Sequence, residues 1–322
     1  MSFTDRVSGR IRLPPGRLAE VGSSDKERKR CIMLLDNQGR RWWKGNLHTH
    51  TTRSDGVKTP EEVTALYRAK GYDFLALTDH WALSDEREEN GLLLLAGCEY
   101  DVGRTAREGV FHIVGAGMSA PPALRKGPGL TPQKIIDGIN AAGGLAILAH
   151  PAWSLNRIGD VLGLTGLAGV EIYNTVSGTP WNARPYSGAF VDQMAVEGAL
   201  LPCMAADDAH FYQGDETRSY LLVQAQECTG AALTQAIRAG RFYATQGPAF
   251  SMEVRDGMLE VTCSPVDEVV FYSDSLYARD RVTRGNGVTA ARYEIKKPAD
   301  HFVRVELTDR DGNTAWSSPL AV

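Results

Sequence analysis

Short apolar runs alternate with amphipathic segments from about residue 44 to about residue 225, and this alternation constrains the fold most. The runs have the length of strands and show no polar face, which is typical of strands covered on both sides. They lie at 74–78, 92–97, 110–117, 145–150, 169–174 and 199–206. Helical segments between such strands predict a parallel sheet covered by helices. About seven strands of this kind favour a closed or nearly closed (β/α) barrel over an open sheet.

Four segments in this region carry helix signals, at 59–71, 131–144, 186–198 and 229–240. The first, "TPEEVTALYRAKG", has Thr59 as the N-cap, Pro60 at the first helical position, acidic residues in the first turn and Gly71 at its end. The second segment, "TPQKIIDGINAAGG", repeats this pattern. We therefore predict a helix in each of the four segments.

The segment after residue 248 has a different pattern. The stretch "FSMEVRDGMLEVTCS", 250–264, indicates two strands across an Asp-Gly turn, and further short strands follow it. We predict three parts: an N-terminal β extension over 1–43 with a hairpin turn at 36–40, an α/β barrel over 44–248, and a small antiparallel, sandwich-like β-domain over 249–322.

Composition and charge exclude several classes of partner. The 322 residues carry a net charge of −4 without a long basic stripe, which argues against nucleic acid. No apolar stretch reaches the length of a membrane span, and the N-terminus lacks the apolar region of a signal peptide. The five cysteines form no CxxC pair, which argues for reduced thiols in a cytoplasmic protein. The oligomeric state is left open.

Six of the seven histidines fall at or near predicted strand ends, each beside an acid or another histidine. In "GNLHTHTTRSDG", His48 and His50 share a face if the segment is extended, and neutral imidazole is a good ligand for transition metals. The other ends contribute Asp79, His80, Glu99, His112, His150, Asp208 and His210. A single such histidine would be a hydrogen-bonded core residue, but six at the carboxyl ends of barrel strands predict a site for several divalent cations.

The motifs "HTHTTRSDG", "LTDH", "CEY", "LAHP" and "DDAH" occur in this order. In order and spacing they resemble the polymerase-and-histidinol-phosphatase (PHP) metallohydrolases. The stretches "WKGNLHTH", "GRFYATQGP" and "DRDGNTAWSSPL" resemble most the branch of this family named after a carbaryl hydrolase. The resemblance spans roughly residues 42–322 and implies a distorted, TIM-like (β/α)7 barrel.

The resemblance also implies two to three divalent metal ions, which would be zinc, manganese or iron. The implied ligand sets of the three ions are His48, His50, Glu99 and Asp208; Glu99, His112 and His150; and Asp55, His80 and His210. Glu99 bridges the first two ions in this scheme. Some family members carry a histidine where this chain has Asp55, so this position departs from the family pattern.

The catalytic candidates are Glu99, Asp208, His210, Asp79 and Arg184. We expect Asp79 to accept a hydrogen bond from a ligand imidazole or a bound water. Arg184, after the strand at 169–174, is a candidate clamp for a substrate phosphate, with a surface salt bridge as the alternative.

Three other polar residues lie beside the candidate ligands. Asp207 is expected to support the metal site from outside the ligand set or to face the substrate. Glu171 and Asn174 either support the site or end their strand.

Such a site predicts hydrolysis of a small phosphate mono- or diester by a hydroxide that bridges two metal ions. No serine or cysteine nucleophile lies in a recognisable triad, so we expect no covalent intermediate. The partner would be a small phosphorylated molecule. Three alternatives stay open: metal-dependent hydrolysis of a carbamate, ester or amide; a nuclease or polymerase-editing module, which the acidic charge disfavours; and a non-catalytic metal-binding domain, which the full ligand set disfavours.

Overall fold

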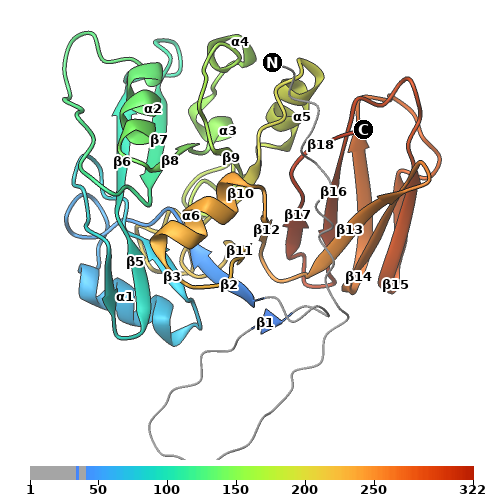
Figure 1. The fold of residues 1–322 in the computed structure, drawn as a ribbon, viewed down its shortest axis with the longest axis horizontal. Coiled ribbons are helices and arrows are strands. Elements are labelled where there is room, and N and C mark those ends of the chain that lie inside the picture. The colour runs from blue at the N-terminus through green and yellow to red at the C-terminus, as the bar shows by residue number, and fades with distance from the viewer. Residues whose placement is uncertain (1–33, 36–40) are drawn as a thin grey trace, which may run out of the picture.

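A computed structural model describes residues 34–35 and 41–322 (Figure 1). The described chain contains a thirteen-stranded sheet and a five-stranded sheet. The main path of the larger sheet runs β13 (Phe250–Arg255), β14 (Met258–Ser273), β16 (Phe302–Thr308), β17 (Thr314–Trp316), β12 (Phe242–Thr245), β11 (Tyr220–Gln224), β2 (Arg41–Asn46), β3 (Phe74–Ala76), β5 (Leu92–Leu95) and β4 (Arg87–Glu89). Three strands pair with this path from the side, namely β1 (Leu34–Leu35), β15 (Val282–Glu294) and β18 (Leu320–Ala321).

The smaller sheet has the order β10 (Cys203–Ala206), β9 (Gly169–Asn174), β8 (Leu145–Leu148), β7 (Phe111–Ala116) and β6 (Gly97–Val102). β9 runs parallel to both neighbours, but β7 is antiparallel to β6 and to β8. The prediction of a wholly parallel sheet is therefore wrong. The connection at 103–110 is too short for a parallel crossover and produces a β-hairpin instead.

Over the described residues the named strands fall in two separate sheets, which are connected at isolated bridges such as Thr49–Ala209 and His80–Glu99 rather than along continuous ladders. The predicted closed (β/α)7 barrel is therefore not confirmed. The fold is nevertheless mixed α/β, as expected. β11 and β12 are antiparallel although α6 connects them, and β11 is also antiparallel to β2. A helix between two strands thus did not imply that the strands are parallel.

The four predicted helices are present as α1 (Pro60–Ala69), α2 (Pro132–Ala141), α5 (Gly188–Val196) and α6 (Gly230–Arg238). Two short helices were not predicted, α3 (Pro151–Ser154) and α4 (Ile158–Val161). Thr59 caps α1 as expected: its side chain accepts from the Glu62 N–H, and the Glu62 carboxylate accepts from the Thr59 N–H. Across the described part of the chain, every helix is too short or too polar to cross a membrane.

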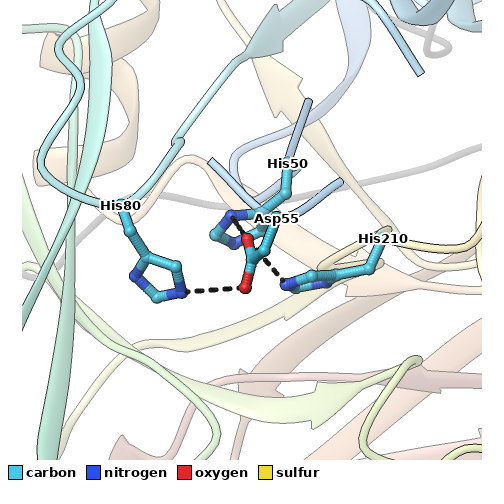
Figure 2. Close-up of side chains that lie close together, drawn as sticks. All are labelled: His50, Asp55, His80 and His210. Carbon is cyan, nitrogen blue, oxygen red and sulfur yellow. Dashed lines mark ion pairs between the residues drawn. The ribbon is translucent and has the colours of Figure 1, made fainter. Parts of the chain in front are cut away.

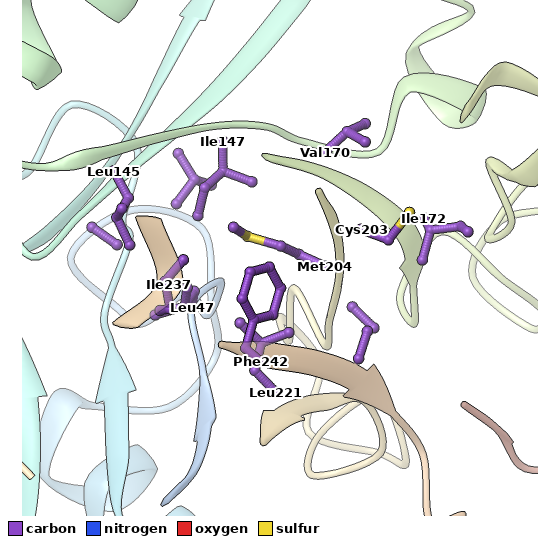
Figure 3. Close-up of a cluster of buried hydrophobic side chains, with 14 of the residues drawn as sticks. Leu47, Leu145, Ile147, Val170, Ile172, Cys203, Met204, Leu221, Ile237 and Phe242 are labelled. Carbon is purple, nitrogen blue, oxygen red and sulfur yellow. The ribbon is translucent and has the colours of Figure 1, made fainter. Parts of the chain in front are cut away.

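One apolar core receives side chains from both sheets (Figure 3). Ile147 of β8 and Val170 of β9 come from the smaller sheet, whereas Leu221 of β11 and Phe242 of β12 come from the larger one. Ile237 of α6 packs into the same cluster and is buried. Because both sheets pack on a shared core, they hold the loops at their strand ends in fixed positions relative to one another.

The C-terminal strands β13 to β18 lie together at the right of Figure 1. β13 and β14 form the predicted hairpin, and Asp256 and Gly257 in its turn have φ values of 50° and 77°, as a type I′ turn requires. β17 pairs with β12, so the larger sheet continues from this region into the rest of the fold.

The predicted boundaries at 43/44 and 248/249 stay predictions. Most of the predicted N-terminal extension, including the turn at 36–40, lies outside the described residues. Of that extension, β1 is described, and it pairs antiparallel with β2.

Candidate metal centre

His48 and His50 lie in the extended segment that follows β2. Thr49 between them forms a parallel bridge with Ala209, so side chains in the segment alternate as they do in a strand. Both histidines are fully buried, and their Nε2 atoms are 3.2 Å apart. The prediction that the two imidazoles share a face is confirmed.

Glu99 of β6 and Asp208 after β10 meet these imidazoles. Glu99 Oε2 lies 3.3 Å from His48 Nε2 and 3.2 Å from His50 Nε2. Asp208 Oδ1 lies 3.1 Å and 3.0 Å from the same two nitrogens. Four possible ligand atoms thus converge, and they belong to the first ligand set that the sequence resemblance implied.

The chemistry of these four atoms fits a cation. Glu171 Oε1 lies 2.7 Å from His48 Nδ1, so the ring proton of His48 belongs on Nδ1 and Nε2 presents a lone pair. Asp208 Oδ1 is buried and accepts no hydrogen bond from the described residues. Buried acceptors without a donor are costly unless a cation satisfies them, and imidazole nitrogens with carboxylate oxygens are typical ligands of divalent transition metals.

The charges of the cluster are strongly coupled. Burial opposes protonation of His48, but the negative charges of Asp208, Glu171 and Glu99 outweigh it and raise its pKa well above the usual value. Burial likewise opposes ionisation of Glu99, but His48 and His112 hold its pKa well below the usual value. Without a metal ion, His48 therefore favours its protonated form and Glu99 its ionised form, and a divalent ion would bind to His48 by displacing a proton.

The second carboxylate oxygen of Glu99 faces another pair of histidines. Its Oε1 lies 2.9 Å from His112 Nδ1 and 3.6 Å from His150 Nε2. His112 stands near the beginning of β7, and because β7 is antiparallel, its beginning lies at the edge where the neighbouring strands end. His80 Nδ1 also approaches Glu99, at 3.3 Å from Oε2. Glu99 thus lies between two groups of imidazoles, the position expected of a bridging ligand.

Asp55 forms the centre of a further group, shown in Figure 2. Its carboxylate oxygens lie 3.4 Å from His50 Nδ1, 3.7 Å from His80 Nε2 and 3.5 Å from His210 Nε2. The resemblance implied Asp55, His80 and His210, and the structure adds His50 to them. Asp55 is exposed, so this group is the more solvent-accessible side of the cluster. All nine predicted ligands therefore gather in one place.

Glu171 and Asn174 contact the candidate ligands without belonging to a ligand set themselves. In addition to His48, Glu171 contacts the backbone N–H of His150, which donates to Oε2 at 2.9 Å. The Asn174 amide donates to Glu171 Oε2 at 2.7 Å and to Asp208 Oδ2 at 3.1 Å. Of the two interpretations left open above, the geometry matches the supporting role.

Asp79 is buried, but its partners differ from those expected. Its carboxylate accepts hydrogen bonds from the backbone and hydroxyl of Thr51 and from the hydroxyl of Ser54. The expected bond to a ligand imidazole is not among its described contacts. Asp79 therefore fixes the loop after His50.

Asp207 faces away from the ligand atoms. It accepts hydrogen bonds from Asn46, from Tyr67 and from the backbone N–H groups of 217–219. Burial raises its pKa to about 6.

Arg184 lies exposed on the loop after β9. Its backbone N–H donates to the Ser177 carbonyl. The role of its side chain as a phosphate clamp stays a prediction.

Sequence reasoning missed Asp215, which positions the loop after β10. Its buried carboxylate accepts from the N–H groups of His210, Phe211 and Gln213 at 2.7, 2.8 and 3.0 Å. Tyr212 in this loop has a positive φ of 53°, a conformation that costs energy for a residue with a side chain. The clue in the sequence was the acid in "HFYQGD", since aspartate side chains commonly bind nearby backbone N–H groups in turns.

Comparison with known proteins bears on the fold. A crystal structure from Bacteroides vulgatus, described as a two-domain protein containing a predicted PHP-like metal-dependent phosphoesterase, has a TM-score of 0.51 and 16% identity over 98% of this chain and 100% of that one. The two chains share a fold. The resemblance to the carbaryl-hydrolase-like branch stays a prediction.

Two further comparisons are more limited. An amidohydrolase from Chromobacterium violaceum gives a TM-score of 0.40 and 18% identity over 53% of this chain and 89% of its own. An uncharacterised protein of Methanocaldococcus jannaschii is 29% identical over 143 residues, which are 41% of this chain and 81% of that protein. No family model matches the sequence.

Proposed function

We propose that the chain is a metal-dependent phosphoesterase that hydrolyses small phosphate mono- or diesters with two to three divalent ions, zinc, manganese or iron. The observation that carries the proposal is the convergence of His48, His50, Glu99 and Asp208 on one buried point. The fold shared with a protein described as containing a predicted phosphoesterase agrees with it. When bound there, divalent ions lower the pKa of a bound water and stabilise charge on phosphate oxygens.

The chain's own residues would hold and orient these groups. Glu99 would serve two ions at once, with His112 and His150 on its far side. Glu171 fixes the tautomer of His48, and Asn174 orients Asp208.

The more exposed group, which has Asp55 at its centre, would face the leaving alcohol of the substrate. His210 Nδ1 donates to the Asp208 carbonyl at 2.7 Å, so Nε2 is directed toward Asp55. Asp79 keeps the loop that carries Asp55 in place through Ser54. Arg184 would bind a phosphate oxygen from the exposed loop.

The first prediction concerns metal content. Protein made in metal-supplemented medium and desalted is expected to hold at least two transition-metal ions per chain, because eight of the nine predicted ligands form three overlapping groups. Elemental analysis measures this stoichiometry. A value near zero after supplementation would contradict the proposal.

The second prediction concerns the reaction. The protein is expected to hydrolyse phosphate esters, to lose activity with a chelator and to regain it with divalent metal. Direct attack by water inverts the configuration at a chiral phosphorus, whereas a route through a phosphoenzyme retains it, and we expect inversion. Retention would refute direct attack. A preference for aryl carbamates over every phosphate ester tested would refute the substrate class and leave the metal site standing.

A further inference from the structure

An exposed tryptophan stands directly against the candidate ligands. α3 begins immediately after His150 and places the Trp153 ring 4.9 Å from the ring of His150 and 5.8 Å from that of His112, centroid to centroid. The His150 ring is itself held by Ser154, whose hydroxyl lies 3.1 Å from Nδ1. Trp153 is 37% exposed, although a side chain of this size is highly buried on average.

A second aromatic wall lies beside His210. Phe211 is 42% exposed, and its ring centroid lies 6.2 Å from that of His210. Trp181 stacks on Phe211 with parallel ring planes, 3° apart in angle and 6.0 Å apart between centroids. We call Trp153, Trp181 and Phe211 the aromatic rim. The residue after Trp181 joins the two walls, because the Trp153 indole N–H donates to the Asn182 side chain at 3.0 Å.

Contacts within the protein restrain the aromatic rim. The backbone of Phe211 is held by the buried Asp215 carboxylate, and Trp153 is held by its bond to Asn182. Rings that are already ordered lose little entropy on binding, so they favour a flat ligand more than mobile side chains would. A flat ring gains stacking or edge-to-face contact with such side chains beyond the simple burial of its area.

Building on the proposed phosphoesterase function, we propose that the substrate carries a flat aromatic ring on the group esterified to its phosphate, and that the aromatic rim binds this ring. Trp153 contacts His112 and His150, which would hold one of the metal ions that bind the phosphate, so a group attached to that phosphate would lie within reach of the rim. A simple aryl group and a nucleobase share this chemistry, and the test below separates them.

The test compares two esters that differ only in the flatness of the ring. 2-Phenylethyl phosphate and 2-cyclohexylethyl phosphate have the same linker and alcohols of similar acidity. We expect kcat/KM to favour the phenyl ester about 3- to 10-fold. Trp153→Leu is expected to bring the ratio near one while the protein keeps its thermal stability. Tyr277→Leu, a control on an exposed tyrosine in the connection between β14 and β15, is expected to keep the wild-type ratio.

A second pair, adenosine 5′-monophosphate and ribose 5-phosphate, distinguishes the source of the ring. A larger preference within the nucleotide pair supports a nucleobase, and a larger one within the phenyl pair supports a simple aryl group. Equal kcat/KM values within both pairs overturn the inference and leave the phosphoesterase function intact. The same holds if Trp153→Leu lowers kcat/KM equally for both members of a pair.

Binding separates the inference from the activity. The phosphonates 2-phenylethylphosphonate and 2-cyclohexylethylphosphonate cannot be hydrolysed at the C–P bond, and calorimetry on the metal-loaded protein measures their affinities. If the phenyl compound binds more tightly and Trp153→Leu abolishes this difference, the result supports the inference even when no ester is hydrolysed. The absence of hydrolysis would refute only the proposed function. Equal affinities overturn the inference.

Discussion

Replacing Glu99 by glutamine is expected to lower hydrolysis about 10³-fold and to reduce the bound metal. Glutamine keeps the shape of the side chain but removes its charge from a buried position that nitrogens of five histidines approach within 3.6 Å. Those histidines are His48, His50, His80, His112 and His150. Metal stabilisation of a transition state contributes several kcal/mol, and about 4 kcal/mol corresponds to about 10³-fold in rate.

Asp55→Asn is the matched control, because it also exchanges a carboxylate for an amide. Asp55 is exposed and its contacts with His50, His80 and His210 are 3.4 Å or longer. We expect a smaller loss of metal and about a tenfold loss of rate, which corresponds to about 1.4 kcal/mol, because Asp55 would serve only the third ion whereas Glu99 would serve two. Elemental analysis after dialysis measures the loss of metal in each variant, and kcat at saturating metal measures the loss of rate. Equal metal loss in the two variants would contradict the bridging position of Glu99.

Replacing Arg304 by leucine is expected to destabilise the fold by about 3–5 kcal/mol. Arg304 of β16 is fully buried, and its guanidinium donates to Asp192 of α5 from Nε at 2.5 Å and from Nη2 at 2.8 Å. It also pairs with Glu306, and it lies 4.0 Å from the ring centroid of Tyr272. Leucine would leave two carboxylates without their cation at a largely buried position.

Two further variants make this test specific. Arg304→Lys keeps the charge but cannot make the bidentate contact. We therefore expect its free energy of unfolding to lie between those of the wild type and of Arg304→Leu. Arg87→Leu removes an exposed arginine whose partner is Glu89, and exposed pairs contribute at most about 1 kcal/mol. Urea unfolding measures all three. If Arg304→Leu were no worse than Arg87→Leu, the buried network would not stabilise the fold.

The sequence predicted the individual elements better than their arrangement. Apolar runs and the Thr59 cap placed the main strands and helices, because these signals are local. The direction of β7 depends on how eight connecting residues fold back, and the separation of the sheets depends on packing between strands distant in sequence. The alternation of strands and helices in the sequence does not indicate either the direction of β7 or the division into two sheets.

The clustering of the candidate ligands was predicted closely because histidines and acids at strand ends stand out in the sequence. The surroundings of these ligands were harder to predict. Asp79 and Asp207 looked like partners of ligands or substrate, but each binds a nearby loop instead. Asp215 and Trp153 lie beside ligands only because of the local turns that carry them. Hydrogen-bonding direction and ring contact are three-dimensional properties, and the identity of one residue does not reveal them.

The pairing of β12 with β17 has a consequence for the order of events during synthesis. β12 pairs with β11 on one side, but the strand on its other side, where Ala315 lies opposite Thr245, exists only once the ribosome has made β17, so until then that side of β12 is the open edge of a sheet. Exposed edges of this kind recruit strands from other chains. We therefore expect a chain that stops before β17 to expose this edge, although every candidate metal ligand has already been synthesised.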